Sequence, residues 1–126
     1  GFGEEVKRRI MLGTFVLSTG YHDAYFTKAQ KIRMLIRNKT DEIFKKYNFI
    51  ISPTTPHTAF KIGGQKKDPT VMYLEDIFTV QANLCGAPAI SLPLKKHSNG
   101  LPIGLHIMAN NFKEKDLLAF SKFLYK

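Results

Sequence analysis

The sequence contains few of the residues that hold a fold together by covalent or metal bonds. Cys85 is its single cysteine among 126 residues, and tryptophan is absent. One cysteine allows neither an internal disulfide nor a cysteine-based zinc site, and we expect it to be a buried, inert thiol. None of the four histidines stands in an H-x-H or H-x-x-x-H pair, so we expect no metal site.

Several motifs of membrane and nucleotide-binding proteins and of hydrolases are also missing. No apolar run approaches the length of a membrane span, and we expect no membrane association. The phosphate loop G-x-x-x-x-G-K-[ST] is absent, so the chain should have no ATP site of its own. No serine lies in a G-x-S-x-G elbow. The residues therefore form no complete catalytic constellation, and we assign no catalytic residue.

Cysteine usage suits a cytoplasmic protein, or an organelle-matrix protein if the source is an organelle.

Positive charge is in excess. Lysine and arginine number 19 against 10 acidic residues, for a net charge of +9. Such a balance is compatible with nucleic acid or an acidic surface as partner. The basic residues are scattered, however, and they form no ladder with aromatic residues of the kind that binds single strands. A solvated, lysine-rich surface is the simpler interpretation; a non-catalytic RNA-binding or partner-binding module is the alternative.

Apolar spacing predicts helices in the first part of the chain. Residues 1–18 carry an apolar stripe, with Glu4 and Glu5 where carboxylates favour the positive end of a helix dipole. A longer helix is expected over 21–47, with a bend or break near 38–40 because helix propensity is poor there. Gly20 separates the two helices.

The remaining elements alternate between strands and short helices. Strands are expected over 49–52, 89–94 and 102–108, the second one buried and the third buried on both faces. Asp68 and Pro69 should start a helix over 70–78, as N-cap and first helical residue. A helical segment over 79–84 and a last helix from Phe112 follow. Asn99-Gly100 predicts a tight hairpin turn, since both residues tolerate positive φ.

These elements predict an α/β fold with a mixed sheet flanked by helices and an antiparallel hairpin near 89–109. Both ends of the sequence look cut. We therefore expect residues 1–126 to be the carboxy-terminal portion of a single larger domain, whose sheet has further strands elsewhere. His106 lies within a strand expected to be buried, where a hydrogen-bonded core histidine is a better interpretation than a general base.

Two charged residues suggest a binding role. Arg9 follows Lys7-Arg8, and Asp76 lies in the segment YLEDI. An arginine fork pairs bidentately with a carboxylate, and an aspartate can bind an ammonium group. Together these residues could hold the two charged groups of a free amino acid. The alternatives are that each is a solvated helix charge or that the two pair with each other.

Several motifs resemble a known family. The hairpin region, with Asn83, Gly86, Pro88, Ile90, Pro93, Gly100, Leu101, Pro102, Gly104 and Leu105, is similar to the carboxy-terminal signature of the amidase-signature hydrolases. The segments GFGEEVKRRI and MYLEDIFT narrow the resemblance to one branch of that family, the A subunits of the glutamyl-tRNA(Gln) amidotransferases. The likeness extends over essentially the whole chain.

This resemblance implies a role in a larger enzyme. Such an A subunit hydrolyses glutamine, and the ammonia passes to a B subunit, which uses ATP and Mg²⁺ to activate the glutamate on misacylated tRNA; a C subunit clasps the other two. The family's Ser–Ser–Lys triad lies in an amino-terminal half outside this chain, so the isolated chain should be inactive. By position, Arg9 (with Arg8 as the neighbouring alternative) would bind the α-carboxylate of glutamine and Asp76 its α-amino group. A general amidase for small amides is the alternative within the family.

Overall fold

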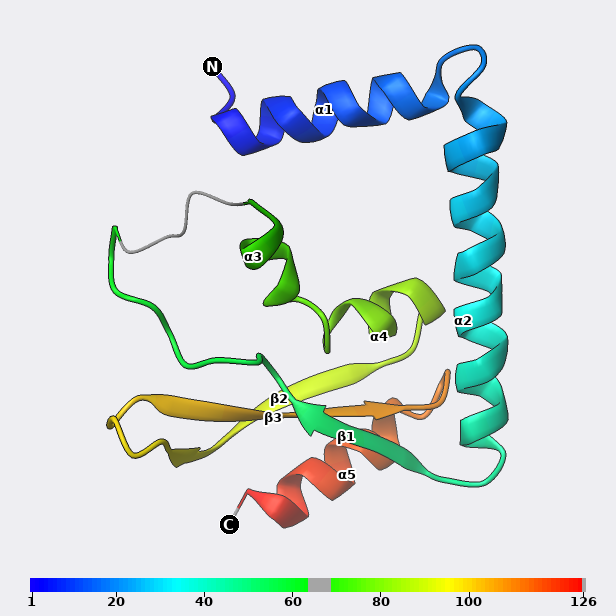
Figure 1. Ribbon diagram of the computed structural model, residues 1–126. Helices are drawn as coiled ribbons and strands as arrows, with labels where there is room; N and C mark the ends of the chain where they lie inside the picture. The colour runs from blue at the N-terminus through cyan, green and yellow to red at the C-terminus, as the bar shows by residue number, and fades with distance from the viewer. Residues whose placement is uncertain (64–68, 126) are drawn as a thin grey trace. The chain divides into compact units, whose positions relative to one another are not determined.

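A computed structural model describes residues 1–63 and 69–125 (Figure 1). The chain divides into two compact units, residues 1–35 and residues 36–126. Each unit has its own architecture, and the long helix α2 (Lys28–Phe44) contributes to both. No helix in the described ranges combines the length and apolar character that crossing a membrane requires.

The first unit is entirely helical. Helix α1 (Glu4–Leu17) confirms the prediction for residues 1–18, and Glu4 and Glu5 occupy its first turn. Gly20, with φ of 85°, separates it from a π-helical segment, η1 (His22–Thr27), that leads directly into α2. Aromatic rings join α1 to this corner, with the centroids of Phe15 and Tyr21 4.3 Å apart.

The irregularity in the second helix lies elsewhere than predicted. Helix α2 runs without a break through residues 38–40, and the departure from α-helical geometry is η1, at its amino-terminal side. Thr40 explains the continuity. Its buried hydroxyl donates to the Ile36 carbonyl at 2.9 Å and accepts from Gln81 Nε2 at 2.9 Å and from Cys85 Sγ at 3.3 Å. The two bonds from Gln81 and Cys85 are tertiary, and they offset the low helix propensity of the segment.

The second unit is built on a three-stranded sheet, with β3 (Pro102–Ala109) between β1 (Phe49–Pro53) and β2 (Ala89–Lys96) (Figure 1). Both pairings are antiparallel. The predicted α/β class is confirmed, and every strand pairing in the described residues is antiparallel. Pro53 ends β1, where a residue without a backbone donor is tolerated on an edge strand.

The hydrophobic core lies between the sheet and α5 (Glu114–Leu124), which packs against β3 and β2. Its buried members are Leu92, Ile107, Ala109 and Leu117. At its margin the rings of Phe49 and Phe120 stack, with centroids 4.5 Å apart and planes at 9°. Alternate residues of a strand point to one face, so the odd-numbered residues of β3 supply this core.

The two hairpin strands are less buried than predicted. His106, Ile107, Met108 and Ala109 are buried, but Pro102 and Ile103 at the start of β3 are exposed. Leu92 is the one buried residue described in β2. For β2 the cause is its position at an edge of the sheet.

The hairpin turn is confirmed at the predicted residues, with another geometry. Gly100 has a φ of 83°, whereas Asn99 keeps a negative φ. Gly100 N–H donates to the His97 carbonyl at 2.8 Å, and His97 N–H donates to the Leu101 carbonyl at 2.7 Å. This pattern belongs to a three-residue loop whose last residue is left-handed, not to a two-residue turn with positive φ at both positions.

The segment between β1 and β2 contains two short helices, α3 (Pro69–Leu74) and α4 (Val80–Cys85). Pro69 is the first residue of α3, as predicted, and Asp68 lies outside the described residues. α3 ends four residues earlier than the predicted Phe78, and turns connect it to α4. Gly86, with φ of 72°, ends α4 in a left-handed conformation.

Candidate substrate-binding site

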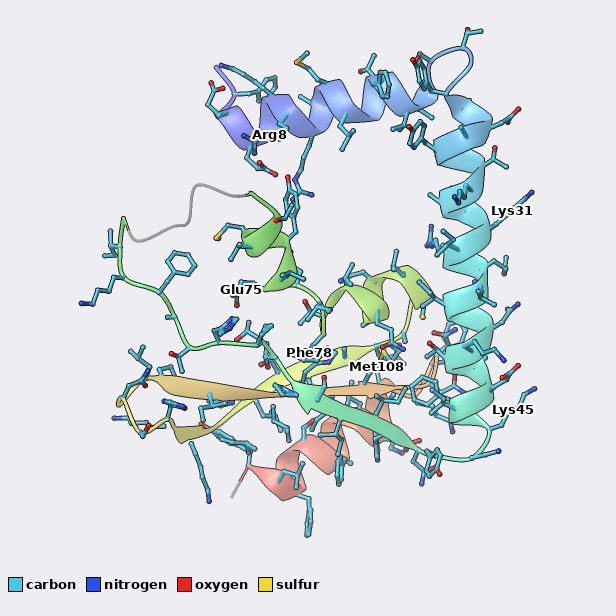
Figure 2. All side chains as sticks on the ribbon, viewed as in Figure 1. Arg8, Lys31, Lys45, Glu75, Phe78 and Met108 are labelled. Atoms are coloured by element: carbon cyan, nitrogen blue, oxygen red, sulfur yellow. The ribbon has the colours of Figure 1, made fainter. Side chains whose placement is uncertain are left out.

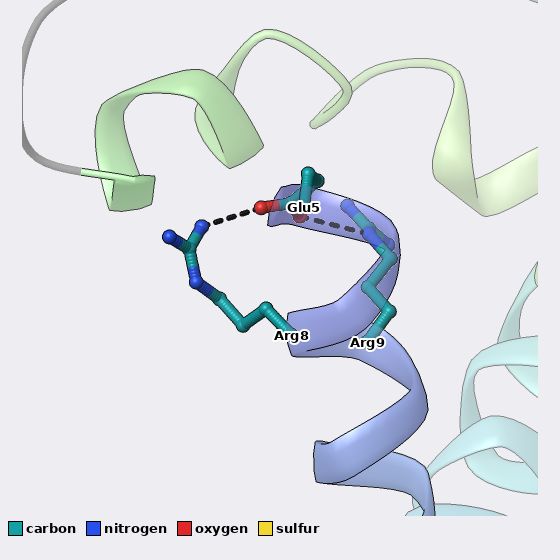
Figure 3. A network of polar contacts seen from close by, with 3 residues as sticks. All are labelled: Glu5, Arg8 and Arg9. Carbon is teal, nitrogen blue, oxygen red and sulfur yellow. Dashed lines mark hydrogen bonds and ion pairs between the residues drawn. The ribbon is translucent and has the colours of Figure 1, made fainter. Parts of the chain in front are cut away.

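Arg9 lies on α1, with its side chain 64% exposed. Its Nε donates to Glu5 Oε1 at 2.9 Å, one helical turn away. Arg8 binds the other oxygen of the same carboxylate through Nη1 (Figure 3). Glu5 therefore holds both arginines that the sequence offers for a carboxylate ligand. Such an exposed pair is weak, so a ligand carboxylate could replace Glu5 as the partner of Arg9.

Asp76 lies in the turn between α3 and α4, and it is exposed. Its backbone carbonyl accepts bonds from the N–H groups of Thr79, at 3.0 Å, and Val80, at 2.9 Å. The Thr79 hydroxyl donates to the same carbonyl at 3.2 Å. The start of α4 thus fixes the backbone of Asp76. Within residues 1–63 and 69–125, no hydrogen bond or ion pair to its carboxylate is described.

Arg9 and Asp76 belong to different units, residues 1–35 and 36–126. Each is described in its own unit, so their joint role stays a prediction. The separate surroundings are compatible with that role, because one exposed guanidinium and one exposed carboxylate are both accessible to a ligand. Arg9 has a carboxylate partner within its own helix.

A histidine–carboxylate pair adjoins Asp76, and the sequence alone did not reveal it. His57 Nδ1 lies 3.0 Å from Glu75 Oε1, although the two residues are 18 positions apart in the sequence. The Glu75 side chain is 24% exposed and the His57 side chain 73%. Figure 2 labels Glu75 among the side chains of this turn. No periodicity relates a loop histidine to a glutamate after the next helix, so only the fold reveals the pair.

A second polar group lies on the sheet face opposite the α5 core. His106 is 6% exposed, and the strand register places it between Ser52 of β1 and Ser91 of β2. Its Nδ1 lies 3.4 Å from Ser52 Oγ. Burial lowers the pKa of His106 below its ordinary value, because a charged imidazolium loses hydration there. The buried position agrees with the predicted core histidine.

A cavity of about 260 Å³ adjoins this face, lined by Thr79, Ala82, Asn83, Ala87, Ala89, Ile90, Ser91 and His106. Its polar groups are hydroxyls, an amide and an imidazole. The lining contains no carboxylate and no lysine or arginine. It therefore lacks the charged groups that would bind the two ends of a free amino acid.

The single cysteine is buried, as predicted, at 3% exposure, and its thiol donates to Thr40. Among the described residues, no three histidine, cysteine or acidic side chains are grouped closely enough to hold a metal ion. Each residue predicted to bind the substrate has neighbours described in its own unit: Glu5 pairs with Arg9 in the first, and Glu75, the sequence neighbour of Asp76, pairs with His57 in the second.

Comparison with known proteins places the fold in a family. The family model described as Amidase matches residues 1–118. The chain belongs to the amidase family. This amidase chain is 58% identical over 114 residues to the A subunit of the glutamyl-tRNA(Gln) amidotransferase of Oceanobacillus iheyensis, a match that covers 90% of this chain and 23% of that protein.

Solved structures agree. The crystal structure of the A subunit of a glutamyl-tRNA(Gln) amidotransferase from Thermotoga maritima superposes with a TM-score of 0.76 at 50% identity, covering 96% of this chain and 26% of that one. A crystal structure of an amidase gives a TM-score of 0.78 at 22% identity, covering 98% of this chain and 28% of that one, and shows the shared fold. The resemblance to amidases seen in the sequence is confirmed. This amidase chain spans about a quarter of the length of the curated relatives it matches.

Proposed function

We propose that this chain is part of the glutamine-hydrolysing A subunit of a tRNA-dependent amidotransferase. The observation that supports this most is the 58% identity, over 90% of the chain, to a protein of that name. The whole subunit would convert glutamine and water into glutamate and ammonia. The ammonia would then serve the conversion of glutamate on misacylated tRNA into glutamine.

The work would be divided between this chain and residues beyond it. A Ser–Ser–Lys triad in another part of the polypeptide would carry the acyl-transfer chemistry, in which a base takes the proton of an attacking hydroxyl. This chain alone would be inactive. The B and C subunits would be its partners: the first would use ATP and Mg²⁺ to activate the glutamyl group, and the second would hold the complex together. We place the assembly in the cytoplasm, or in an organelle matrix if the source is an organelle.

Within this chain, Arg9 and Asp76 would recognise glutamine. The guanidinium of Arg9 would leave Glu5 and bind the α-carboxylate of the substrate. The carboxylate of Asp76 would bind the α-ammonium group. Both interactions depend on groups that a simple amide lacks, so they would give selectivity for a free amino acid without taking part in bond breaking.

Ammonia release from glutamine, compared with release from a simple aliphatic amide, tests the proposal. The longer polypeptide should act on glutamine, and the 126-residue chain alone should act on neither substrate. Hydrolysis of the simple amide but not glutamine would indicate a general amidase. Inactivity of both forms, with salt-sensitive RNA binding by the folded short chain, would indicate a non-catalytic module.

Arg9→Ala in the longer polypeptide should raise the KM for glutamine by about 30-fold or more. Loss of one member of a desolvated charge pair costs about 2–5 kcal/mol, and 1.4 kcal/mol is tenfold. Arg8→Ala is the matched control and should have a much smaller effect. An unchanged KM for Arg9→Ala would exclude this residue from substrate recognition.

A further inference from the structure

We propose that His57 and Glu75 are positioning residues, which hold the turn containing Asp76 at the place where it meets the α-amino group of glutamine. The inference rests on the proposed function. It concerns residues 53–63 and 69–106 of the second unit alone, where a series of hydrogen bonds leads from the sheet to Asp76.

The loop that carries His57 is attached to the sheet on its amino-terminal side. Thr54 N–H donates to the Gly104 carbonyl of β3 at 3.0 Å. The hydroxyls of Thr54 and Ser91 are 2.6 Å apart, which joins the loop to β2. A Cβ on Gly104 would lie 2.5 Å from Thr54 Oγ1 and 2.9 Å from Ser91 Oγ. Glycine at this position therefore permits the close approach that anchors the loop.

The same loop is attached again just beyond His57. Asn99 Nδ2, in the hairpin turn, donates to Thr58 Oγ1 at 3.0 Å. Thr55 Oγ1 donates to the His57 carbonyl at 2.7 Å. His57 thus lies between two attachments to the sheet and hairpin, and its backbone carbonyl has a partner within the loop. The backbone of His57 is held in this way, whereas its side chain is largely exposed and has Glu75 as its hydrogen-bond partner.

The carboxylate of Glu75 accepts a hydrogen bond from the His57 ring. With a proton on Nδ1, the imidazole donates to Glu75 Oε1 whether the ring is neutral or protonated. The Glu75 side chain is the better buried of the two, so the pair fixes the carboxylate that most needs a partner. The interaction ties the end of α3 to the loop after β1 across a separation of 18 residues.

The turn that contains Asp76 needs a restraint of this kind because its own backbone hydrogen bonds are long. Glu75 N–H reaches the Met72 carbonyl at 3.2 Å, and Asp76 N–H reaches the Tyr73 carbonyl at 3.3 Å. Helix α3 has only six residues, and a helix of that length is not stable by itself. On its carboxy-terminal side Asp76 is fixed by the start of α4. On its amino-terminal side the His57–Glu75 pair supplies the corresponding restraint.

The pair also separates the roles of two adjacent carboxylates. Glu75 and Asp76 are sequence neighbours, and either could attract an ammonium group. His57 occupies Glu75, whereas no partner for the Asp76 carboxylate is described within residues 1–63 and 69–125. The geometry thus leaves Asp76 for the ligand and keeps Glu75 from competing with it.

The experiment measures steady-state hydrolysis of glutamine and of a simple aliphatic amide by the full-length polypeptide in its complex. We expect His57→Ala and Glu75→Gln each to raise the KM for glutamine by about 3- to 10-fold, equivalent to about 0.6–1.4 kcal/mol. The kcat/KM for the simple amide should stay unchanged. His57→Asn should restore most of the affinity, because Asn Nδ2 stands where Nδ1 stood.

His22→Ala is the matched control. His22 Nδ1 lies 3.2 Å from Asp23 Oδ1, so it also pairs with a carboxylate, but with its sequence neighbour. Its loss breaks no link between distant segments, and KM should not change. Hydrogen exchange gives a second readout: backbone amides over 70–80 should exchange faster in His57→Ala and Glu75→Gln, and at the native rate in His22→Ala.

The outcomes separate the inference from the proposed function. If Asp76→Asn raises the KM for glutamine while His57→Ala and Glu75→Gln match the native enzyme, the positioning role is wrong and the function stands. If these two variants impair both substrates equally, their role is general stability, and the inference is again wrong. If the native complex does not hydrolyse glutamine, or Asp76→Asn has no effect on it, the proposed recognition of glutamine fails as well.

Discussion

Residues 1–35 and residues 36–126 differ in the sequence separation of the contacts that stabilise them. The described residues of the first unit include none that is buried, and the ion pairs of α1 join residues three or four apart. All the buried residues described lie in the second unit, where, in addition to local bonds, side-chain hydrogen bonds connect segments 18 to 54 positions apart. Contacts between neighbouring residues specify the first unit, and contacts between distant residues specify the second.

The comparison shows where single substitutions should matter. Local helical bonds are exposed to water and contribute little each. Buried groups in the second unit have no solvent to replace a lost partner, so their removal costs more. Substitutions in each unit test this difference through the free energy of unfolding of the longer polypeptide.

The largest effect should come from the core. Ile107 is 0% exposed, and Ile107→Ala should lower the free energy of unfolding by about 2–5 kcal/mol, since it removes buried methyl groups and leaves a cavity. Its register partner on β1, Ile51, is 50% exposed, and Ile51→Ala should cost clearly less. Denaturant unfolding measures both. If Ile10→Ala in α1, 52% exposed, cost as much as Ile107→Ala, the contrast between the two regions would be wrong.

Two threonines test the same contrast for hydrogen bonds. Thr40 and Thr14 each donate to a carbonyl four residues earlier, at 2.9 Å. Thr40→Val should cost about 1–3 kcal/mol, because Gln81 Nε2 then loses a buried acceptor. Thr14→Val should change the stability by less than about 0.5 kcal/mol, as for most surface substitutions. Equal effects in chemical denaturation would show that the bonds around Thr40 do not stabilise the helix.

The two regions should also respond to different ranges of pH. The lowered pKa of His106 means that the unfolded state binds its proton first, so stability falls as pH drops below the ordinary value of 6.5. His106→Gln should flatten this dependence in urea unfolding between pH 7 and pH 5. In the first unit, bonds from His22 and then Thr27 lower the pKa of Asp23 from 3.8. The stability that Asp23 contributes is therefore present above pH 3.8 and is lost only in stronger acid. A pH dependence unchanged by His106→Gln would contradict the assignment.

The smallest effect should come from an exposed ion pair. Lys7 Nζ lies 2.8 Å from Glu4 Oε1, and the two side chains are 55% and 85% exposed. Lys7→Ala should change the stability by no more than about 0.5 kcal/mol. Added salt should abolish that difference, because exposed charges are screened. A difference of several kcal/mol that persists at high salt, on the order of 1 M, would mean that Lys7 has a role beyond this pair.

Prediction from the sequence succeeded where the cause is local. The apolar stripe and first-turn glutamates predicted α1, Pro69 predicted the start of α3, and Asn99-Gly100 predicted the hairpin turn. It failed where the cause lies elsewhere in the fold. Two tertiary bonds, from Gln81 and Cys85 to Thr40, keep α2 continuous through a segment of poor helix propensity. An edge position leaves most of β2 exposed, although its composition suited a buried strand.

For the candidate site, residue chemistry and resemblance suggested Arg9 and Asp76, because their motifs are continuous stretches of sequence. Their role in binding stays a prediction. Neither the pairing of Arg9 with Glu5 nor the link between His57 and Glu75 was part of that prediction.

The sequence by itself determined the family, helix α1, the start of α3 and the place of the hairpin turn, because each depends on neighbouring residues. The tertiary structure decided which strand is central, how α2 stays continuous and which carboxylate is already occupied. Those properties depend on contacts between segments far apart in the chain, and these contacts exist only once the chain has folded.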